Sequence, residues 1–427
     1  MVSQVSTNNP ANAPRTRRVF LVVIDALGVG ALPDAPAFGD SLSVNTLGNI
    51  DRHAQRLHLP HLAQLGLGHI VPLAQVPAVE HPTGVYGKLA EVSLGKDTTT
   101  GHWEMAGIIL ETPFPVFPEG FPTGLIEQFV AETGCGGVLG NKPASGTAIL
   151  DELGVAHLET GFPIVYTSAD SVFQVAAHVD RVPLETLYSW CEVARRLLEG
   201  PLQVSRVIAR PFEGSPGGFR RLGAARHDYA VPPPTPNVLT TIAQQTQGVV
   251  LGVGKIDDIF CGVGITHHLH TRSNAHGLEV LIQLAKGELA LPSLAKAGFE
   301  QRTGEKQLIF INLVETDMNF GHRRDVNGYA HALEAIDTEL AALIDHLTPE
   351  DLLLITADHG CDPTAPGSDH TREYVPLLMF SKGLSVAHPA QNLGIRQSFA
   401  DVGQTALAWL GIQPTASLPG KAVLPLV

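Results

Sequence analysis

Several short apolar runs end close to acidic residues, and these runs constrain the fold more than any other feature of the sequence. The apolar residues are continuous rather than alternating, which is typical of strands buried on both faces of a parallel sheet. We therefore expect an α/β fold in which helices flank a mostly parallel sheet. The runs are residues 19–24 before Asp25, 308–314 before Asp317 and 352–356 before Asp358, with further candidates at 249–253 and 376–380.

A helical pattern separates the second and third of these runs. Between residues 333 and 347 apolar side chains recur every three or four positions, which predicts an amphipathic helix. Strand, helix and strand in this order form a parallel βαβ unit. Ligands of open parallel sheets gather at the carboxyl ends of the strands, so we expect Asp25, Asp317 and Asp358 to converge there.

Composition and charge exclude several classes of partner. The chain has 427 residues, with 28 Lys and Arg against 42 Asp and Glu, and a net charge of −14. Nucleic acids and anionic membranes attract the opposite charge, so we expect neither as a partner. The sequence contains no run of eighteen apolar residues, so it predicts no transmembrane helix. The four cysteines form no Cys-x-x-Cys pair, which favours a reducing, cytoplasmic location.

The N-terminus allows two interpretations. Residues 15–23 place three arginines in and before an apolar run and are similar to a twin-arginine export signal. The apolar part of such a signal would have to include Asp25. We therefore favour a disordered polar tail over residues 1–16, followed by the first strand.

Residues 110–235 differ from the rest of the chain because they are rich in glycine and proline, with prolines grouped near both ends. Proline clusters at both ends of such a long stretch predict a separate domain that is inserted into the core domain through two hinges. We expect a core domain over residues 17–112 and 233–427 and a smaller α+β cap over 113–232. One large domain with long loops is the alternative.

Three carboxylates and three imidazoles are hard to explain structurally, because charged or polar groups buried at strand ends need partners. A metal would supply them. The set contains no thiolate and suits Mn²⁺ or Zn²⁺, and six ligands are enough for two ions. Any one of these residues could instead cap a helix, but the whole set favours metal binding. Its members are Asp25, Asp317, His322, Asp358, His359 and His370.

Residues 95–104, Gly-Lys-Asp-Thr-Thr-Thr-Gly-His-Trp-Glu, form a second motif. A hydroxyl between glycines can lie at a helix N-terminus, where amide dipoles stabilise an anion such as a phosphoryl group. A neighbouring dication would favour the alkoxide of a threonine. An ordinary helix cap is the alternative for this run.

Other sequence motifs carry less weight. The chain has no Gly-x-Ser-x-Gly elbow, and its Gly-rich stretches do not complete a Rossmann or P-loop motif. Four histidines between residues 267 and 276 could bind metal, but they lack a carboxylate pattern, and we interpret this stretch as a solvated loop.

Taken together, the acidic and histidine motifs and Thr98 resemble the alkaline phosphatase superfamily, and longer motifs resemble the bacterial phosphopentomutase family. The resemblance covers nearly the whole chain except the N-terminal tail. One difference is that the family often has a small polar residue after the aspartate that corresponds to Asp25, whereas this chain has Ala26. The matching stretches are residues 95–104, Ser168–Ser171, Ala209–Phe212, Arg226–Tyr229, Gly254–Phe260 and Thr356–Gly360.

The resemblance implies an alkaline phosphatase-like core that interconverts α-D-ribose 1-phosphate and D-ribose 5-phosphate, and the 2-deoxyribose compounds, in nucleoside catabolism. It also implies two divalent ions, most often Mn²⁺, a phosphorylated Thr98, and a sugar bisphosphate activator such as glucose 1,6-bisphosphate. Lys255 and His102 would stabilise the transferring oxygens. The implied ligands of the ion nearest Thr98 are Asp25, Asp358 and His359, and those of the other ion are Asp317, His322 and His370. The resemblance further implies that Ser168 and Asp170 bind the sugar. Arg210 and Arg226 would bind its distal phosphate.

Two other enzyme classes and one non-enzyme class stay open at this point. A phosphatase, phosphodiesterase or sulfatase of the same superfamily would use water as the acceptor. A phosphoglycerate mutase is disfavoured by the cap motifs, and a metal-storage protein by the complete set of candidate nucleophile and ligands.

Overall fold

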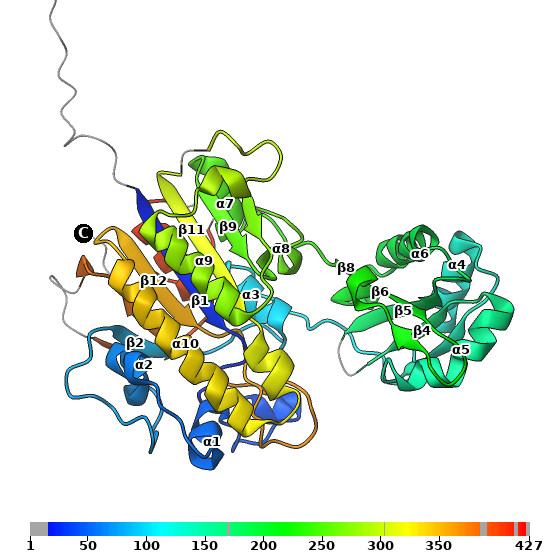
Figure 1. Ribbon diagram of the computed structural model, residues 1–427, viewed down its shortest axis with the longest axis horizontal. Coiled ribbons are helices and arrows are strands. Elements are labelled where there is room, and N and C mark those ends of the chain that lie inside the picture. Colours follow the sequence, from blue (N-terminus) through cyan, green and yellow to red (C-terminus); the bar gives the residue numbers. More distant parts are fainter. Residues whose placement is uncertain (1–15, 169–170, 303, 385–390, 414–416, 424–427) are drawn as a thin grey trace, which may run out of the picture. The chain divides into compact units, whose positions relative to one another are not determined.

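The chain folds into two compact units, one made of residues up to Glu111 and from Pro233 onward, the other of Thr112–Pro232 (Figure 1). The computed structural model describes residues 16–168, 171–302, 304–384, 391–413 and 417–423. Residues 1–15 of the expected 1–16 tail and the candidate sugar ligand Asp170 lie outside the described residues. Among the helices that are described, none is both long and apolar enough to cross a bilayer.

An eight-stranded sheet lies at the centre of the larger unit, in the order β10-β9-β11-β1-β12-β13-β2-β14. The first five strands in this order are parallel to one another. β13 is antiparallel to both of its neighbours, and β14 is parallel to β2. The strands are β1 (Arg17–Ile24), β2 (Val85–Leu89), β9 (Val249–Val253), β10 (His267–Leu269), β11 (Lys306–Leu313), β12 (Asp351–Thr356), β13 (Val375–Phe380) and β14 (Asn392–Arg396).

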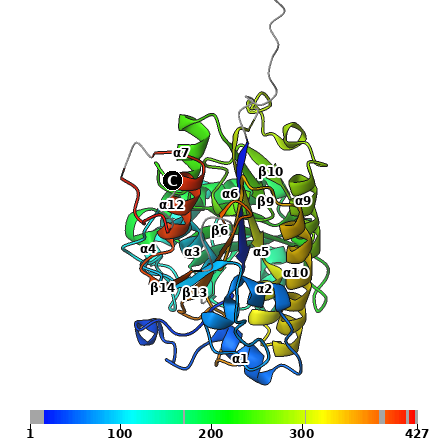
Figure 2. The ribbon, with the colours of Figure 1, turned by 90° about the vertical axis from the view of Figure 1, so that its left-hand side faces the viewer.

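Helices cover both faces of this sheet. Figure 2 shows α9 and α10 on one side of the strands and α3, α7 and α12 on the other. The helices of this unit are α1 (Thr46–His53), α2 (Pro60–Leu65), α3 (Thr98–Met105), α7 (Val238–Gln245), α8 (Ile256–Ile259), α9 (Asn274–Lys286), α10 (Val326–His346) and α12 (Ala400–Trp409).

The predicted α/β class and mostly parallel sheet are confirmed. All five apolar runs are strands, and residues 333–346 of the predicted crossover helix form the C-terminal two thirds of α10. The four residues Leu352–Ile355 are fully buried, and burial of each such side chain contributes about 1.5–3 kcal/mol. Continuous apolar runs therefore identified five of the eight strands, although they did not reveal that β13 is antiparallel.

The interpretation of residues 267–276 as a solvated loop is wrong. His267 lies in β10, which pairs with β9, and its side chain is fully buried with Nδ1 2.8 Å from the hydroxyl of Thr266. Ser273 then caps α9 by accepting a hydrogen bond from the amide of His276. A three-residue edge strand with two histidines has no apolar run, and for this reason the sequence pattern missed it.

The smaller unit has its own sheet, in the order β3-β4-β5-β6-β7, with β8 pairing with β6. Its core lies between this sheet and α4 and α6, where Phe129, Phe173 and Trp190 are buried together. Its use as a cap stays a prediction. The elements are α4 (Thr123–Thr133), β3 (Leu139–Pro143), α5 (Ala148–Thr160), β4 (Ile164–Thr167), β5 (Val172–His178), α6 (Leu184–Leu197), β6 (Arg206–Glu213), β7 (Arg220–Arg221) and β8 (His227–Ala230).

Two buried charged residues just before β13 fix the loops around the carboxyl edge of the larger sheet. The Arg372 guanidinium is 1% exposed and donates to the carboxylate of Glu91 at 2.7 Å and to the carbonyl oxygen of Gly95 at 2.6 Å. Next to it, the Glu373 carboxylate accepts hydrogen bonds from the amides of Gly30 and Thr46 and from the Thr46 hydroxyl. The segment around residue 372 is thereby tied to the segments that precede Thr98 and follow β1.

The stability of the protein should decrease with pH through Glu373. Burial raises the pKa of Glu373 to about 7 from its ordinary 4.5, although its hydrogen bonds lower it. Between these values the unfolded chain has lost the proton that the folded chain still holds, so rising pH favours unfolding. Ionisation of Glu373 should therefore lower the free energy of unfolding by about 3 kcal/mol as the pH rises from 4.5 to about 7. Urea unfolding of the wild type and Glu373→Gln between pH 5 and 8 measures this as a changing difference between the two curves. A difference that is constant with pH contradicts the assignment.

Candidate active site

Three carboxylates meet at the carboxyl edge of the larger sheet. β1 lies between β11 and β12, and Val23 is level with Asn312 on one neighbour and Thr356 on the other. Asp25 directly follows β1, while Asp317 and Asp358 follow the two neighbouring strands after a few residues. The three side chains are between 0% and 7% exposed, and the charges of Asp317 and Asp358 both act on the carboxyl group of Asp25, so the predicted convergence is present.

The first cluster consists of Asp25, Asp358 and His359, all of them buried. His359 Nε2 lies 3.5 Å from Asp25 Oδ1 and 3.4 Å from Asp358 Oδ2. The other carboxylate oxygen of Asp358 accepts a hydrogen bond from the amide of Ala26 at 3.0 Å. Ala26 has a φ of 65°, a left-handed conformation that brings its amide toward Asp358. The left-handed conformation of Ala26 destabilises the fold by about 1 kcal/mol, but it positions the carboxylate of Asp358.

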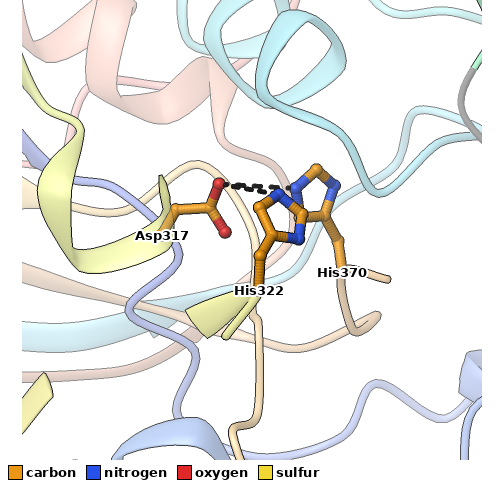
Figure 3. Close-up of side chains that lie close together, drawn as sticks. All are labelled: Asp317, His322 and His370. Atoms are coloured by element: carbon orange, nitrogen blue, oxygen red, sulfur yellow. Dashed lines mark ion pairs between the residues drawn. The ribbon is translucent and has the colours of Figure 1, made fainter. Parts of the chain in front are cut away.

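The second cluster consists of Asp317, His322 and His370, and Figure 3 shows both imidazoles facing the Asp317 carboxylate. Asp317 Oδ2 lies 3.1 Å from His322 Nε2 and 3.7 Å from His370 Nε2. Residues Thr316–Gly321 form a π-helical turn in which the amide of His322 donates to the carbonyl oxygen of Asp317. An α-helix would turn residue i+5 away from residue i, whereas the wider π turn places both side chains together.

The two clusters are neighbours, because the ring centroids of His359 and His370 are only 4.0 Å apart. The outer nitrogens of two of the histidines are oriented by backbone carbonyls: Nδ1 of His322 lies 2.7 Å from Ser368 O, and Nδ1 of His359 lies 3.1 Å from Gly360 O. Such contacts fix the ring orientation of metal-binding histidines.

Burial and mutual repulsion perturb the carboxyl groups. Burial, together with the charges of Asp358 and Asp317, raises the pKa of Asp25 well above its ordinary value. Burial would also raise the pKa of Asp317, but hydrogen bonds from His322 and His370 hold it well below the ordinary value. The pKa of Asp358 is lowered in the same way against burial, chiefly by His359 and His102. Of these three carboxyl groups, only that of Asp25 has a raised pKa, because the cationic groups around it do not offset burial and the two neighbouring carboxylates.

The residues of both clusters fit divalent cations. Asp25 Oδ1, Asp317 Oδ1 and Asp358 Oδ2 are buried and accept no hydrogen bond in the described part of the chain. Buried carboxylate oxygens without donors are costly unless a cation replaces the lost water. Each cluster offers carboxylate and imidazole atoms within 4.8 Å of one another, which suits manganese or zinc better than calcium.

Thr98 lies at the first position of α3, beside the first cluster, with its Oγ1 3.2 Å from His359 Nε2. Asp97 caps the helix by accepting from the amides of Thr99 and Thr100. A Cβ atom on Gly101 would collide with the carbonyl oxygen of Asp358. The glycine thus allows α3 to lie directly against the loop that carries the acidic ligands, and this contact places the Thr98 hydroxyl.

The two other candidate catalytic residues lie in different surroundings. His102 is fully buried, with Nδ1 2.8 Å from the carbonyl oxygen of Thr98 and 3.3 Å from Asp358 Oδ2. This position suits orientation of Asp358 better than direct contact with substrate. Lys255 is exposed at the start of α8 and lowers the pKa of Asp25, although burial and two carboxylates outweigh it. Lys255 is therefore close to the first cluster and accessible.

The remaining candidates lie in the smaller unit. Arg210 on β6 is partly buried and donates from Nε to Gln174 at 3.0 Å. Arg226 is exposed and forms two hydrogen bonds with the carboxylate of Asp228, at 2.6 and 2.5 Å. Ser168 is partly buried at the end of β4. Since each unit is described by itself, binding of the same substrate by these residues and Thr98 stays a prediction.

Sequence reasoning missed the residues that hold the site in place. Ala26, Asp97 and Gly101 contact candidate functional residues through backbone atoms or by a close approach, and only the Asp-Thr-Thr-Thr-Gly spacing hinted at a capped, tightly packed helix. Arg372 and Glu373 have no motif that distinguishes them from surface charges. Their burial is visible only in the structure.

Comparisons with known proteins identify the family of the chain. The Metalloenzyme superfamily matches residues 17–414. A phosphopentomutase from Caldanaerobacter subterraneus subsp. tengcongensis is 51% identical over 398 residues, which cover 93% of this chain and 95% of the relative. One from Anaeromyxobacter sp. strain K is 51% identical over 397 residues, covering 93% and 96%. One from Symbiobacterium thermophilum is 50% identical over 399 residues, again covering 93% and 96%. The chain belongs to the Metalloenzyme superfamily and, within it, to the phosphopentomutase family of isomerases.

Proposed function

We propose that the chain interconverts α-D-ribose 1-phosphate and D-ribose 5-phosphate, and the 2-deoxyribose equivalents, through a phosphorylated Thr98. The single observation that carries this proposal is the position of the Thr98 hydroxyl at a helix N-terminus, 3.2 Å from Nε2 of His359 and beside two clusters of residues that could hold metal ions. A helix N-terminus stabilises the charge of a phosphoryl group.

Asp25, Asp358 and His359 would hold one divalent ion, and Asp317, His322 and His370 the other. Ions bound there would neutralise the charge of the transferring phosphoryl group and lower the pKa of the attacking hydroxyl. Mn²⁺ is the proposed native metal, and a sugar bisphosphate such as glucose 1,6-bisphosphate is the proposed activator. We place the enzyme in nucleoside catabolism in the cytoplasm.

The proposed reaction has two transfers. A hydroxyl of the sugar monophosphate attacks phosphorus on phospho-Thr98, the bond from phosphorus to Oγ1 breaks, and the proton of the sugar hydroxyl passes to Oγ1. The resulting ribose 1,5-bisphosphate reorients, and Oγ1 of Thr98 attacks its other phosphoryl group. The bond from that phosphorus to the sugar oxygen breaks, the proton returns to the sugar oxygen, and the isomeric monophosphate leaves. Both transfers need an in-line arrangement of the attacking and leaving oxygens.

Residues around Thr98 position and shield this chemistry. His102, which is 3.3 Å from Asp358 Oδ2, would orient that carboxylate, and Lys255 would neutralise charge on the transferring oxygens. Ser168 and Asp170 would contact the sugar, and Arg210 and Arg226 its distal phosphate. Exclusion of water by the smaller unit would separate a mutase from a phosphatase.

Replacement of Thr98 by alanine should abolish isomerisation, because no other atom would carry the phosphoryl group between the two transfers. We expect the rate of ribose 5-phosphate formation to fall by about 10³-fold or more. Thr99→Ala is the matched control, since Thr99 is the next residue of α3 and only its backbone amide bonds to the cap. Wild-type rates in Thr98→Ala would refute the covalent step.

The products separate a mutase from a hydrolase. Incubation with ribose 1-phosphate, Mn²⁺ and a trace of glucose 1,6-bisphosphate should yield ribose 5-phosphate with little free phosphate. Both products can be followed in one reaction, by coupled enzymatic assay and by a colorimetric phosphate assay. Free phosphate without isomer would assign the chain to a hydrolase of the same superfamily.

Each metal cluster should bind one ion independently. We expect Asp25→Asn and Asp317→Asn each to reduce the manganese content from about two ions per chain to about one, because each removes a buried carboxylate from one cluster only. Asp369→Asn is the control, since Asp369 is next to His370 but pairs with Lys96 at 3.0 Å. Elemental analysis after equilibrium dialysis measures the content. Unchanged content in both test variants contradicts the proposed sites.

A further inference from the structure

We propose that Arg324 is a positioning residue for the second cluster, because it clamps the loop that orients His322 and carries His370. Arg324 lies two positions after His322 and is partly buried. It would act through the backbone of residues 362–369 rather than by contact with a metal ion or a substrate. This inference rests on the metal sites of the proposed function, and its test therefore includes a measurement on the metal-free chain.

The loop over residues 362–369 has little structure of its own. It contains no helix or strand, and most of its residues after Pro363 are exposed. The amide of Ala365 bonds to the carbonyl oxygen of Asp362, but in the described part of the chain residues 366–369 form no backbone–backbone hydrogen bond. A segment of this kind opens easily unless side chains hold it. The carbonyl groups at its end therefore depend on side chains for their position.

Arg324 holds three of the loop's carbonyl groups with one guanidinium group. Nη1 donates to the carbonyl oxygen of Asp362 at 2.5 Å, Nε donates to that of Gly367 at 2.7 Å, and Nη2 donates to that of Asp369 at 3.3 Å. The acceptors lie at the beginning and at the end of the loop. The planar guanidinium group thus ties both ends of the loop together, and the single ammonium group of a lysine has no comparable geometry.

The clamped loop contains the carbonyl group that orients His322. Nδ1 of His322 lies 2.7 Å from the carbonyl oxygen of Ser368, a residue between two of the acceptors of Arg324. A carbonyl oxygen can only accept, so Nδ1 carries the proton of the neutral ring. The lone pair of Nε2 is then available to a cation shared with Asp317 Oδ2, which lies 3.1 Å away. A partner on the outer nitrogen in this way sets the tautomer and the ring orientation of a metal-binding histidine.

The same loop leads into the other imidazole of the second cluster. His370 directly follows Asp369, whose carbonyl oxygen accepts from Arg324, and the amide of His370 donates to the Asp369 carboxylate at 2.8 Å. The ring centroids of His322 and His370 are 4.8 Å apart, and both rings face Asp317 (Figure 3). Arg324 therefore acts on both histidines, on one through Ser368 and on the other through Asp369.

The backbone of Arg324 favours glycine rather than arginine. Its φ is 58°, a left-handed conformation that is unfavourable for a residue with a Cβ atom and ordinary for glycine. Its amide donates to the carbonyl oxygen of Gly321 at the end of the π turn. The sequence thus keeps a long side chain at a position where glycine would fit the backbone best. This supports a role for the guanidinium group itself.

Manganese binding by the full-length, EDTA-treated chain tests the proposal, by equilibrium dialysis and elemental analysis over a range of Mn²⁺ concentrations. Arg324→Gly removes the side chain and suits the left-handed backbone, and Arg324→Gln shortens it and removes its charge. We expect the affinity for one of two ions to fall about 10- to 100-fold in both variants, because misoriented histidines bind the ion less well. The affinity for the other ion should stay within twofold of the wild type.

Combination with ligand variants shows which cluster is affected. In Asp25→Asn only the second cluster should bind an ion, and addition of Arg324→Gly should weaken that ion at least tenfold. In Asp317→Asn only the first cluster should bind an ion, and addition of Arg324→Gly should change its affinity by less than twofold. Equal losses in the two backgrounds would mean general destabilisation and would overturn the positioning role.

Arg323→Gln is the matched control. Arg323 is the exposed neighbour of Arg324, and among the described residues its side chain forms no hydrogen bond or ion pair. Its replacement should change the affinity for neither ion by more than twofold. Thermal unfolding of each variant shows whether it is folded. Arg324→Lys, which keeps the charge but cannot reach three carbonyl groups, replaces the other two variants if they do not fold.

Hydrogen exchange of the metal-free chain measures the clamp without any ion. Amides in peptides over residues 361–371 should exchange at least threefold faster in Arg324→Gly than in the wild type, because the loop opens more often. Arg323→Gln should exchange at the wild-type rate.

The outcomes separate the clamp from the proposed function. A loss of affinity confined to the second cluster, together with faster exchange, supports the clamp. Wild-type affinity at the second cluster in the Arg324 variants, or unchanged exchange of the loop, overturns it. A wild type that binds no manganese would overturn the metal sites and the positioning role together. Absence of isomerase activity in a chain that binds two ions would refute the proposed function alone.

Discussion

The repulsion among three buried carboxylates is the constraint on which the rest of this structure depends. Asp25, Asp317 and Asp358 follow three adjacent parallel strands and are almost completely buried. Protein groups hold the pKa of two of them low, yet the pKa of Asp25 is raised by burial and by its two acidic neighbours. We propose that divalent cations bound between these groups remove that cost and give the Thr98 hydroxyl its reactivity. On this proposal, stability and chemistry at this edge have one physical origin.

Close backbone approaches convert this charge cluster into a site with defined geometry. Gly101 lets α3 contact the loop after β12, and the left-handed Ala26 directs its amide to Asp358. Arg372 and Glu373, both 1% exposed, tie the segment that follows His370 to the loops around Gly30 and Gly95. Each interaction fixes a loop rather than a strand. The sheet thus sets where the ligands meet, and these buried contacts set their separations.

Much of the core could be predicted from sequence because its signals are local. Continuous apolar runs located β1, β9, β11, β12 and β13, and the carboxyl-edge rule predicted that Asp25, Asp317 and Asp358 converge. The π turn that brings Asp317 and His322 together has no comparable signal, since the i, i+5 spacing is normally unfavourable for contact on a helix. His267 was misread because a three-residue edge strand depends on its pairing with β9 rather than on composition. The hydrogen bonds of Arg226 to Asp228 are likewise a property of packing.

The central claim is that phosphate passes through the hydroxyl of Thr98. The most direct measurement is to incubate the manganese-loaded chain with glucose 1,6-bisphosphate labelled with ³²P, quench it, and identify the labelled residue by peptide mass spectrometry. The account predicts one labelled residue, Thr98, and loss of the label when ribose 1-phosphate or ribose 5-phosphate is added. A label on any other residue, or an unlabelled protein that still forms the isomer, would contradict it.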